Sequence, residues 1–227
     1  MKLVMYSIPK TGTSTVEYNA KKALSKVESF VVNAPEFEKF QELTPEDLRQ
    51  YKFVSGHRIN LEIVQRLKEL DSSFRAITLF RDPADQIVSA YNYARNYKYK
   101  YSVPFFFWYR FLIPRNPQAS HFERRFMGRW LPSFFLKKRD LDYFVRAFEI
   151  FDEIICTDQI NVRIPELFEQ CGILPRTAEL IRRKETGIHY QTYLKLNEKL
   201  KRKLERDNAL DVALYRHFKT TIEAAAH

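Results

Sequence analysis

The sequence is poor in cysteine, in glycine and in long apolar runs. Its 227 residues include two cysteines and five glycines. Two cysteines build neither a disulfide framework nor a four-cysteine zinc site. The scarcity of glycine and the 15% of aromatic residues argue against disorder. The longest apolar stretch, 101–109, is about half of the roughly 20 residues that a membrane-spanning helix needs. The first residues lack a signal peptide's apolar core. We therefore expect one domain over 1–227 in a reduced, cytoplasmic setting.

Acidic residues are almost missing from one part of the chain, residues 95–139, which we call the cationic segment. It holds eleven Lys and Arg but a single acid, Glu123, so its net charge of +10 equals that of the whole protein. The same segment contains 14 of the 34 aromatic residues, including Trp108 and Trp130. The rest of the chain is neutral. A charge excess confined in this way indicates a surface that meets an acidic or interfacial partner.

Strand and helix patterns alternate along the chain. Short apolar runs predict strands at 2–8, 29–32, 52–55, 74–80 and 153–157. Helical spacing and capping residues predict helices at 13–26, from 44, 61–70, 83–96, 141–148, 164–171, 192–206 and 208–221. This alternation predicts an α/β, three-layer, P-loop-like fold with a central parallel sheet flanked by helices, and 97–120 is expected to be irregular. Ligands of such sheets bind beyond the carboxyl ends of the strands, here 9–15, 56–57 and 81–82.

Residues 9–15 (PKTGTST) follow the first strand and open a helix. A loop in this position offers successive backbone N–H groups and the positive end of the helix dipole to an anion. A Walker A loop needs Gly-x-x-x-x-Gly-Lys-[Ser/Thr], whereas here the lysine precedes a lone glycine, which argues against a nucleoside triphosphatase. A threonine-rich capped turn is the alternative. The candidate anion-binding residues are Lys10, Thr11, Gly12, Thr13, Ser14 and Thr15.

Residues 81–91 (RDPADQIVSAY) follow the strongest predicted strand. Arg81 ends this strand, where its side chain is expected to enter the ligand crevice, and Ser89 lies near the middle of the next helix. An arginine and a serine that converge there bind a second phosphate, with the guanidinium in bidentate geometry. The alternative is an ion pair of Arg81 with Asp82 or Asp85.

Together the two loops resemble the sulfotransferases that use 3′-phosphoadenosine 5′-phosphosulfate (PAPS). The family's 5′-phosphosulfate loop, Pro-Lys-x-Gly-Thr-[Thr/Ser], is matched at 9–14. Its 3′-phosphate element, Arg-Asp-Pro-x-x-Arg-x-x-Ser-x-Tyr, is matched at 81–91, with Gln86 at a peripheral position where arginine is common. The resemblance covers roughly 1–96 and resumes weakly at 153–220. It implies PAPS as the donor, no metal, and in-line transfer of the sulfuryl group to an acceptor hydroxyl.

The catalytic candidates are His57 and Lys10. Lys10 would hold the bridging oxygen of the leaving phosphate as negative charge builds on it. The Gly-His pair at 56–57 resembles the carbohydrate branch that includes heparan sulfate 2-O-sulfotransferase, which implies that His57 is the base. A base with a pKa near 7 suits an alcohol that loses its proton late. Glu36 and Glu38, after the second strand, are the rival bases, and a structural role for His57 is the plain alternative.

Two further segments match the carbohydrate branch loosely. Lys184 and Thr186 lie where it has a basic, hydroxyl-bearing loop that closes over the donor, and 211–215 resembles its closing helix. The histidines that have no comparable context are predicted to be surface or packing residues. These are His121, His189 and His217.

The cationic segment supports several interpretations. Its aromatic and basic residues suit a sugar or polyanion platform, a membrane-surface patch for a lipid-linked acceptor, or nucleic-acid binding. Core aromatics with a solvated basic face are the plain alternative. We favour an acceptor lid at 97–139 with peripheral membrane contact and a carbohydrate or glycolipid acceptor, over nucleic acid. The competing functions are a P-loop nucleotide kinase and a non-catalytic protein that binds nucleic acid or membrane.

Overall fold

The computed structural model describes residues 1–34, 36–96, 115–128, 140–181 and 191–225. Its centre is a parallel sheet in the order β2-β3-β1-β4-β5. The strands are β1 (Lys2–Tyr6), β2 (Ser29–Val31), β3 (Phe53–Gly56), β4 (Phe74–Phe80) and β5 (Glu153–Cys156). The predicted α/β fold with a central parallel sheet is therefore confirmed, and the strands begin and end within two residues of their predicted bounds.

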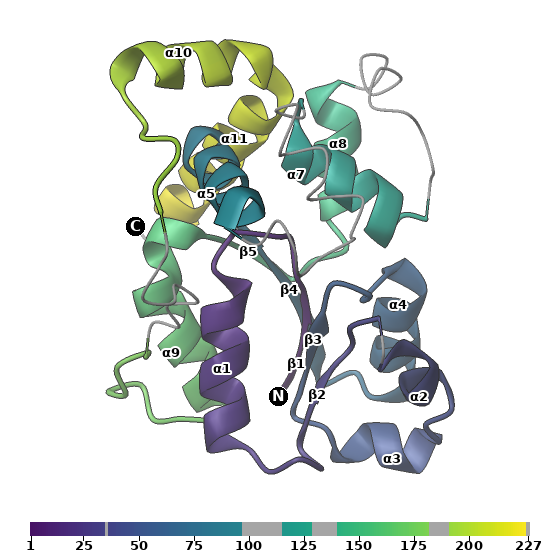
Figure 1. The fold of residues 1–227 in the computed structure, drawn as a ribbon. Helices are drawn as coiled ribbons and strands as arrows, with labels where there is room; N and C mark the ends of the chain where they lie inside the picture. The colour runs from purple at the N-terminus through teal and green to yellow at the C-terminus, as the bar shows by residue number, and fades with distance from the viewer. Residues whose placement is uncertain (35, 97–114, 129–139, 182–190, 226–227) are drawn as a thin grey trace.

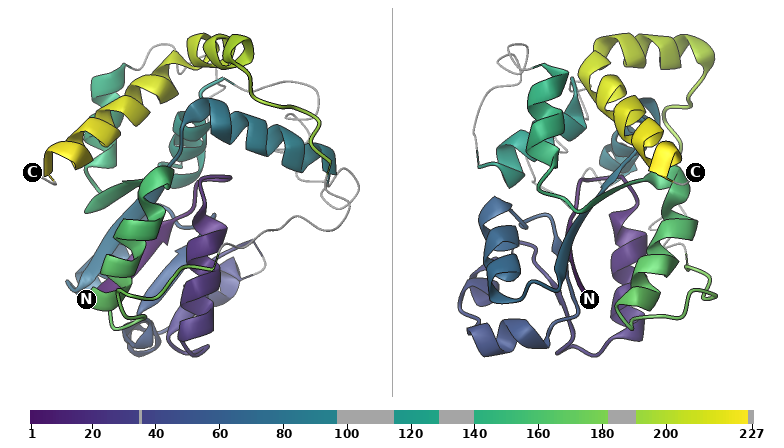
Figure 2. Two further views of the ribbon diagram at one scale, coloured as in Figure 1. Left: turned by 90° about the vertical axis from the view of Figure 1, so that its left-hand side faces the viewer. Right: turned by 180° about the vertical axis from the view of Figure 1, so that it is seen from behind.

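Helices cover both faces of the sheet, so that the fold has three layers (Figure 1). The helices α1 (Thr13–Ala23) and α9 (Ile160–Gln170) lie on one face, and α2 (Phe37–Gln41), α3 (Pro45–Gln50) and α4 (Leu61–Leu70) lie on the other. The other helices in the described residues are α5 (Pro83–Asn96), α7 (Pro117–His121), the π-helix η1 (Phe122–Phe126), α8 (Leu141–Phe148), the 3₁₀ helix η3 (Thr157–Gln159), α10 (Glu198–Asp207) and α11 (Ala209–Ala225). Figure 2 shows the same layers from the side and from behind. Within the described ranges no helix combines the length and apolar character that a membrane crossing requires.

Side-chain caps set several helix starts where the sequence predicts them. The Thr44 hydroxyl accepts the N–H of Asp47, whose carboxylate accepts the N–H of Thr44 in return, which is a capping box. Asn60 caps α4 and Asp140 caps α8, each by accepting an N–H three residues on. Local chemistry alone therefore determines these boundaries.

The sheet separates two apolar cores. Along β1, Leu3 and Met5 face α1 and α9, whereas Val4 and Tyr6 face the opposite layer. All four side chains are fully buried, as expected for a central parallel strand that is covered on both faces.

Several predicted boundaries are wrong. The helix predicted at 13–26 ends at Ala23, and the helix predicted at 192–206 begins at Glu198. The helix predicted at 164–171 begins at Ile160, directly after η3, and runs through Pro165. Pro165 is the sixth residue of α9, beyond the first turn, so α9 lacks the helical hydrogen bond that an N–H at this position would make. The segment 97–120 was expected to be irregular, but 117–121 forms α7 and is followed by η1. This helix is stabilised by groups far away in the sequence, as described below.

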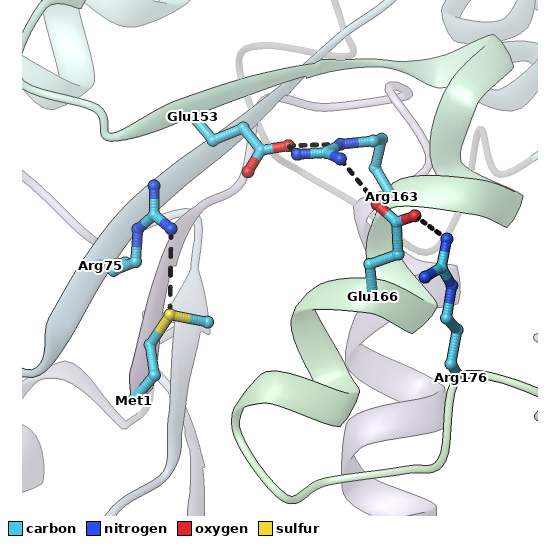
Figure 3. A network of polar contacts seen from close by, with 6 residues as sticks. All are labelled: Met1, Arg75, Glu153, Arg163, Glu166 and Arg176. Carbon is cyan, nitrogen blue, oxygen red and sulfur yellow. Dashed lines mark hydrogen bonds and ion pairs between the residues drawn. The ribbon is translucent and has the colours of Figure 1, made fainter. Parts of the chain in front are cut away.

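A chain of ion pairs lies at the amino end of β5 (Figure 3). Arg163 of α9 pairs with Glu153 at 2.8 Å and with Glu166 at 2.6 Å, and Glu166 also pairs with Arg176. These side chains are partly exposed, so each pair adds little to stability. The network links β5 to α9 at the amino ends of the strands. Ligands of this fold class bind at the opposite edge, beyond the carboxyl ends of the strands.

Candidate functional site

The loop after β1 makes a tight turn that opens α1. Lys10 and Gly12 both have positive φ, 66° and 96°, and a Cβ on Gly12 would lie 2.6 Å from Ile160 Cδ1. The backbone conformation therefore favours glycine at this position, whereas the end of the Ile160 side chain could move aside. Gly12 is also the N-cap of α1 and has no side chain with which to cap it. The first N–H groups of a helix have no acceptor within the helix, so this end offers donors to an anion.

The hydroxyl and N–H groups of this loop do not all point to a ligand. The Thr11 side chain is buried and its hydroxyl donates to the carbonyl oxygen of Ile8 at 2.8 Å. The N–H of Thr15 donates to the carbonyl oxygen of Gly12 at 3.0 Å. Thr11 and Thr15 thus brace the turn with one group each. The side chain of Thr13 is almost fully buried, and that of Ser14 is half-buried.

The loops after β1 and β4 are joined by two hydrogen bonds. Arg81, the first residue after β4, donates from Nη1 to the carbonyl oxygen of Lys10 at 3.3 Å. Gln86 of α5 donates from Nε2 to the carbonyl oxygen of Pro9 at 2.9 Å. The hydrogen bond to Lys10 accounts for the position of the Arg81 side chain without the alternative ion pair with Asp82 or Asp85. The structure therefore brings the two predicted anion-binding loops together.

Gln86 has a larger structural role than its predicted peripheral position indicates. The side chain is 1% exposed, and its Oε1 is buried without a hydrogen-bond partner among the described residues. Such an atom costs free energy unless a group outside the described residues satisfies it. The departure from the family pattern at this position therefore supplies the contact that holds the first loop.

Helix α5 turns one face toward the loop after β1. The ammonium of Lys10 lies 4.0 Å from the centroid of the Tyr93 ring, close enough for a cation–π contact. Tyr93 and Gln86 are seven residues apart on α5, and Ser89 lies three residues after Gln86. Since residues three and four apart share a helix face, Ser89 lies on the face that meets this loop. Ser89 is half-buried there.

His57 follows β3 directly and is exposed. Its Nδ1 lies 2.6 Å from the carbonyl oxygen of Ser7. A carbonyl oxygen only accepts, so Nδ1 carries the proton, and in the neutral ring Nε2 has the free lone pair. Gly56 makes this placement possible, because it has φ 141° and a Cβ there would lie 2.2 Å from the carbonyl oxygen of Val32.

A second histidine lies beside His57. His121 of α7 is buried, and its ring centroid is 6.3 Å from that of His57. Its Nδ1 shares a 2.5 Å hydrogen bond with the hydroxyl of Tyr6, the last residue of β1. Burial is the main cause that lowers the pKa of His121 well below its usual value, and the charges of His57, Arg125 and Arg124 add to it. The burial of His121 agrees with the packing role, one of the two roles predicted for it. Its position beside His57 was not predicted.

The rival bases follow β2. Glu36 is the N-cap of α2, and its Oε2 is buried without a partner among the described residues. Glu38, two residues on, is exposed. Both remain candidates.

Thr157, which was not predicted, directly follows β5. Its hydroxyl lies 2.8 Å from the carbonyl oxygen of Thr11 and 3.2 Å from that of Phe80.

The predicted closing loop with Lys184 and Thr186 lies outside the described residues, as does His189. Its two flanks are described. Ile181 exchanges hydrogen bonds of 2.9 and 3.0 Å with Asn19 of α1, and Gln191 exchanges two of 2.8 Å with Asn96 of α5. The flanks are thus attached to the two helices that border the loops described above.

Only residues 95, 96 and 115–128 of the cationic segment are described. Within them, Phe122 and Phe126 belong to the core, and the ring of Phe122 stacks on Phe148 with centroids 4.0 Å apart. Glu123, the single acid, is buried and accepts from the hydroxyl of Tyr143 at 3.2 Å. Core packing therefore explains these aromatic residues, whereas the run of aromatic residues at 105–109 lies outside the described ranges.

Comparison with known proteins supports the fold. No protein-family model and no curated protein sequence matches the chain. Among solved structures, a sulfotransferase from Alicyclobacillus acidocaldarius aligns over 95% of this chain and 94% of its own, with TM-score 0.50 and 11% identity. Mouse sulfotransferase SULT7A1, complexed with PAP, aligns over 90% of this chain and 63% of its own, with TM-score 0.39 and 14% identity. The first of these shows that the chain has the fold of a sulfotransferase.

Proposed function

We propose that this protein is a sulfotransferase that moves the sulfuryl group of PAPS to an acceptor hydroxyl. One observation carries the proposal: the two loops that resemble the family's phosphate-binding elements are hydrogen-bonded to each other at the carboxyl edge of the sheet. The bonds are Arg81 Nη1 to Lys10 O and Gln86 Nε2 to Pro9 O. The two loops are adjacent, as a donor with a phosphate at each end would require.

The first loop would hold the 5′-phosphosulfate. Gly12 leaves the backbone open for close approach, and the N–H groups at the start of α1 donate to the phosphate oxygens. The second loop would hold the 3′-phosphate, with Arg81 as the bidentate cation and Ser89 as a hydroxyl donor on the same side of α5. In this proposal Lys184 and Thr186 complete the donor site from the closing loop.

His57 and Lys10 would carry the chemistry. The acceptor oxygen attacks sulfur while Nε2 of His57 takes the proton from that oxygen. The bond between sulfur and the bridging oxygen breaks, and the electron pair stays on the 5′-phosphate of the leaving 3′-phosphoadenosine 5′-phosphate (PAP). Lys10 stabilises the charge that builds on this oxygen. The contact of His57 with Ser7 supports its role, because it leaves Nε2 unprotonated in the neutral ring.

A carbohydrate or glycolipid is the acceptor that we propose. The charge distribution supports this proposal. The cationic segment carries a net charge of +10 and does not include the donor-binding residues Lys10 and Arg81, so we assign its charge to the acceptor. A lid at 97–139 that contacts a membrane surface would bring such an acceptor to His57. We also propose that, among sulfotransferases, the protein is nearest to the carbohydrate branch that includes heparan sulfate 2-O-sulfotransferase. The Gly-His pair at 56–57 supports this part of the proposal.

Calorimetric titration in EDTA tests this function against its rivals. A PAPS-dependent sulfotransferase binds PAP without metal and binds ATP weakly. A nucleotide kinase would require Mg²⁺ and prefer ATP. A protein that only binds polyanions or membranes would bind heparin, oligonucleotides or anionic vesicles and show no heat with PAP. The absence of metal-free PAP binding would contradict the proposal.

A further inference from the structure

The side chain of Gln118 holds the backbone of Arg81 on both sides. Its Oε1 accepts the N–H of Arg81 at 3.0 Å, and its Nε2 donates to the carbonyl oxygen of Arg81 at 2.8 Å. Gln118 is fully buried in α7. Arg81 follows the last residue of β4. The Gln118 side chain therefore pairs with both backbone groups of Arg81, as a residue of a neighbouring strand would, and fixes the backbone just beyond β4. The pair is local in space but 37 residues apart in sequence.

Gln118 is itself fixed by α11. The side-chain carboxyl group of Asp211 accepts the N–H of Gln118 through Oδ2 and the N–H of Ala119 through Oδ1, each at 2.9 Å. Asp211 is fully buried. A second pair of contacts joins the same ends, because the N–H of Asn116 donates to Asn208 Oδ1 and the N–H of Asp211 donates to Asn116 Oδ1. The start of α7 therefore has a set position relative to α11.

Contacts thus run without a break from α11 to the first loop. Asp211 holds Gln118, Gln118 holds the backbone of Arg81, and the guanidinium of Arg81 reaches the carbonyl oxygen of Lys10. A long, flexible arginine side chain binds a phosphate well only if its backbone is set in the right place. Gln118 is uncharged, so any effect that it has on the donor passes through Arg81.

We propose that Gln118, anchored by Asp211, is the positioning residue for Arg81 and so determines how strongly the protein recognises the 3′-phosphate. The inference rests on the proposed function, since it assigns Arg81 to that phosphate. A glutamine that served stability alone would affect binding of the whole nucleotide or none of it. A positioning residue for Arg81 affects only the part of the affinity that the 3′-phosphate contributes.

The test compares PAP with adenosine 5′-monophosphate (AMP), which lacks the 3′-phosphate, in EDTA. Gln118→Met keeps the length of the side chain and removes both of its hydrogen bonds. We expect its PAP affinity to fall about ten- to a hundredfold while its AMP affinity stays within about twofold of the wild-type value. Gln86→Met is the matched control, because Gln86 is equally buried but holds Pro9 of the first loop. In that variant PAP and AMP affinity should fall by the same factor.

Gln118→Glu provides a rescue within one variant. A protonated carboxyl group accepts through one oxygen and donates through the other, as the glutamine amide does, whereas a carboxylate cannot donate to the carbonyl oxygen of Arg81. The ratio of PAP to AMP affinity in Gln118→Glu, divided by the wild-type ratio at the same pH, should therefore rise as the pH is lowered from 8 to 5.5. This series decides the question if Gln118→Met does not fold.

The outcomes separate the two proposals. A wild-type protein that binds PAP and AMP equally would contradict the proposed function. A wild type that prefers PAP, together with a Gln118→Met variant of unchanged preference, would overturn the positioning role and leave the function standing. A Gln118→Glu series that is flat with pH relative to wild type would also overturn the positioning role.

Discussion

His57 donates from Nδ1 to the carbonyl oxygen of Ser7 across a distance of 2.6 Å. Ser7 follows β1 and precedes Lys10 by three residues, so the loop that carries the lysine also orients the histidine. The contact leaves Nε2 as the nitrogen that carries the lone pair in the neutral ring, and its acceptor is a backbone oxygen that substitution of Ser7 would not remove. The loop that carries Lys10 therefore also sets the orientation of the His57 ring.

His57→Ala should lower kcat by about 10²- to 10⁴-fold, because the acceptor hydroxyl loses its general base. PAP affinity should stay unchanged, since the ring contacts the loop only through a carbonyl oxygen. Turnover of PAPS to PAP in the presence of acceptor, with calorimetry for binding, measures both. His217→Ala on the exposed part of α11 is the control. Near-normal kcat in His57→Ala would remove its role and turn attention to Glu36.

Lys10→Met should lower kcat by about 10²- to 10³-fold, the cost of losing one donor at a developing negative charge. The fold should persist, because Lys10 is partly exposed and methionine keeps the apolar part of its side chain beside the ring of Tyr93. Circular dichroism checks the fold and PAPS turnover checks the rate. A well-folded Lys10→Met variant with kcat within threefold of the wild-type value would show that another group stabilises the leaving phosphate.

Gly56→Ala should prevent folding or lower the free energy of unfolding by several kcal/mol. A Cβ at this position would lie 2.2 Å from the carbonyl oxygen of Val32, and the φ of 141° is closed to alanine. Gly172→Ala is the matched control, because its φ of 62° is also positive but no atom lies within 4 Å of the added Cβ. It should cost about 1–2 kcal/mol. Equal losses in urea denaturation for the two variants would contradict the close approach of β2 to β3.

Asp211 should make stability depend on pH. Burial raises the pKa of this carboxyl group from 3.8 to about 7, so the folded protein keeps a proton that the unfolded chain loses between these values. Its contribution to stability is therefore fully present below pH 4 and is lost as the pH rises to 7. The free energy of unfolding of the wild type, relative to Asp211→Asn, should fall by up to about 1.4 kcal/mol per pH unit over this range.

Asp142→Asn is the control for that series, because Asp142 is an exposed acid in the first turn of α8. A difference between the wild type and Asp211→Asn that stays constant from pH 4 to 7 would show that Asp211 is ionised throughout.

Local patterns were sufficient to predict the sheet and the two loops. Strand β4 and helix α5 have the predicted bounds, 74–80 and 83–96, because a mainly apolar run and a proline in the first helical turn determine them locally. The loop after β1 is defined by Gly12, whose position in the sequence already indicates a backbone turn. These features need only neighbouring residues, so that the sequence alone reveals them.

Long-range contacts were not predictable in this way. Helix α7 depends on Asp211, which is more than 90 residues away, and Gln118 meets Arg81 only in the folded chain. The same holds for His121, whose place beside His57 follows from the position of α7. The one signal for Gln86 was its departure from the family pattern, but the contact with Pro9 requires the folded loops.

The most direct test of the donor site is the ratio of the PAP and AMP dissociation constants, measured without metal for the wild type and Arg81→Met. We expect the wild type to bind PAP at least tenfold more tightly than AMP, and Arg81→Met to lose most of this preference while its AMP affinity is retained. Equal affinities in the wild type, or an unchanged preference in Arg81→Met, would contradict a 3′-phosphate site at the end of β4.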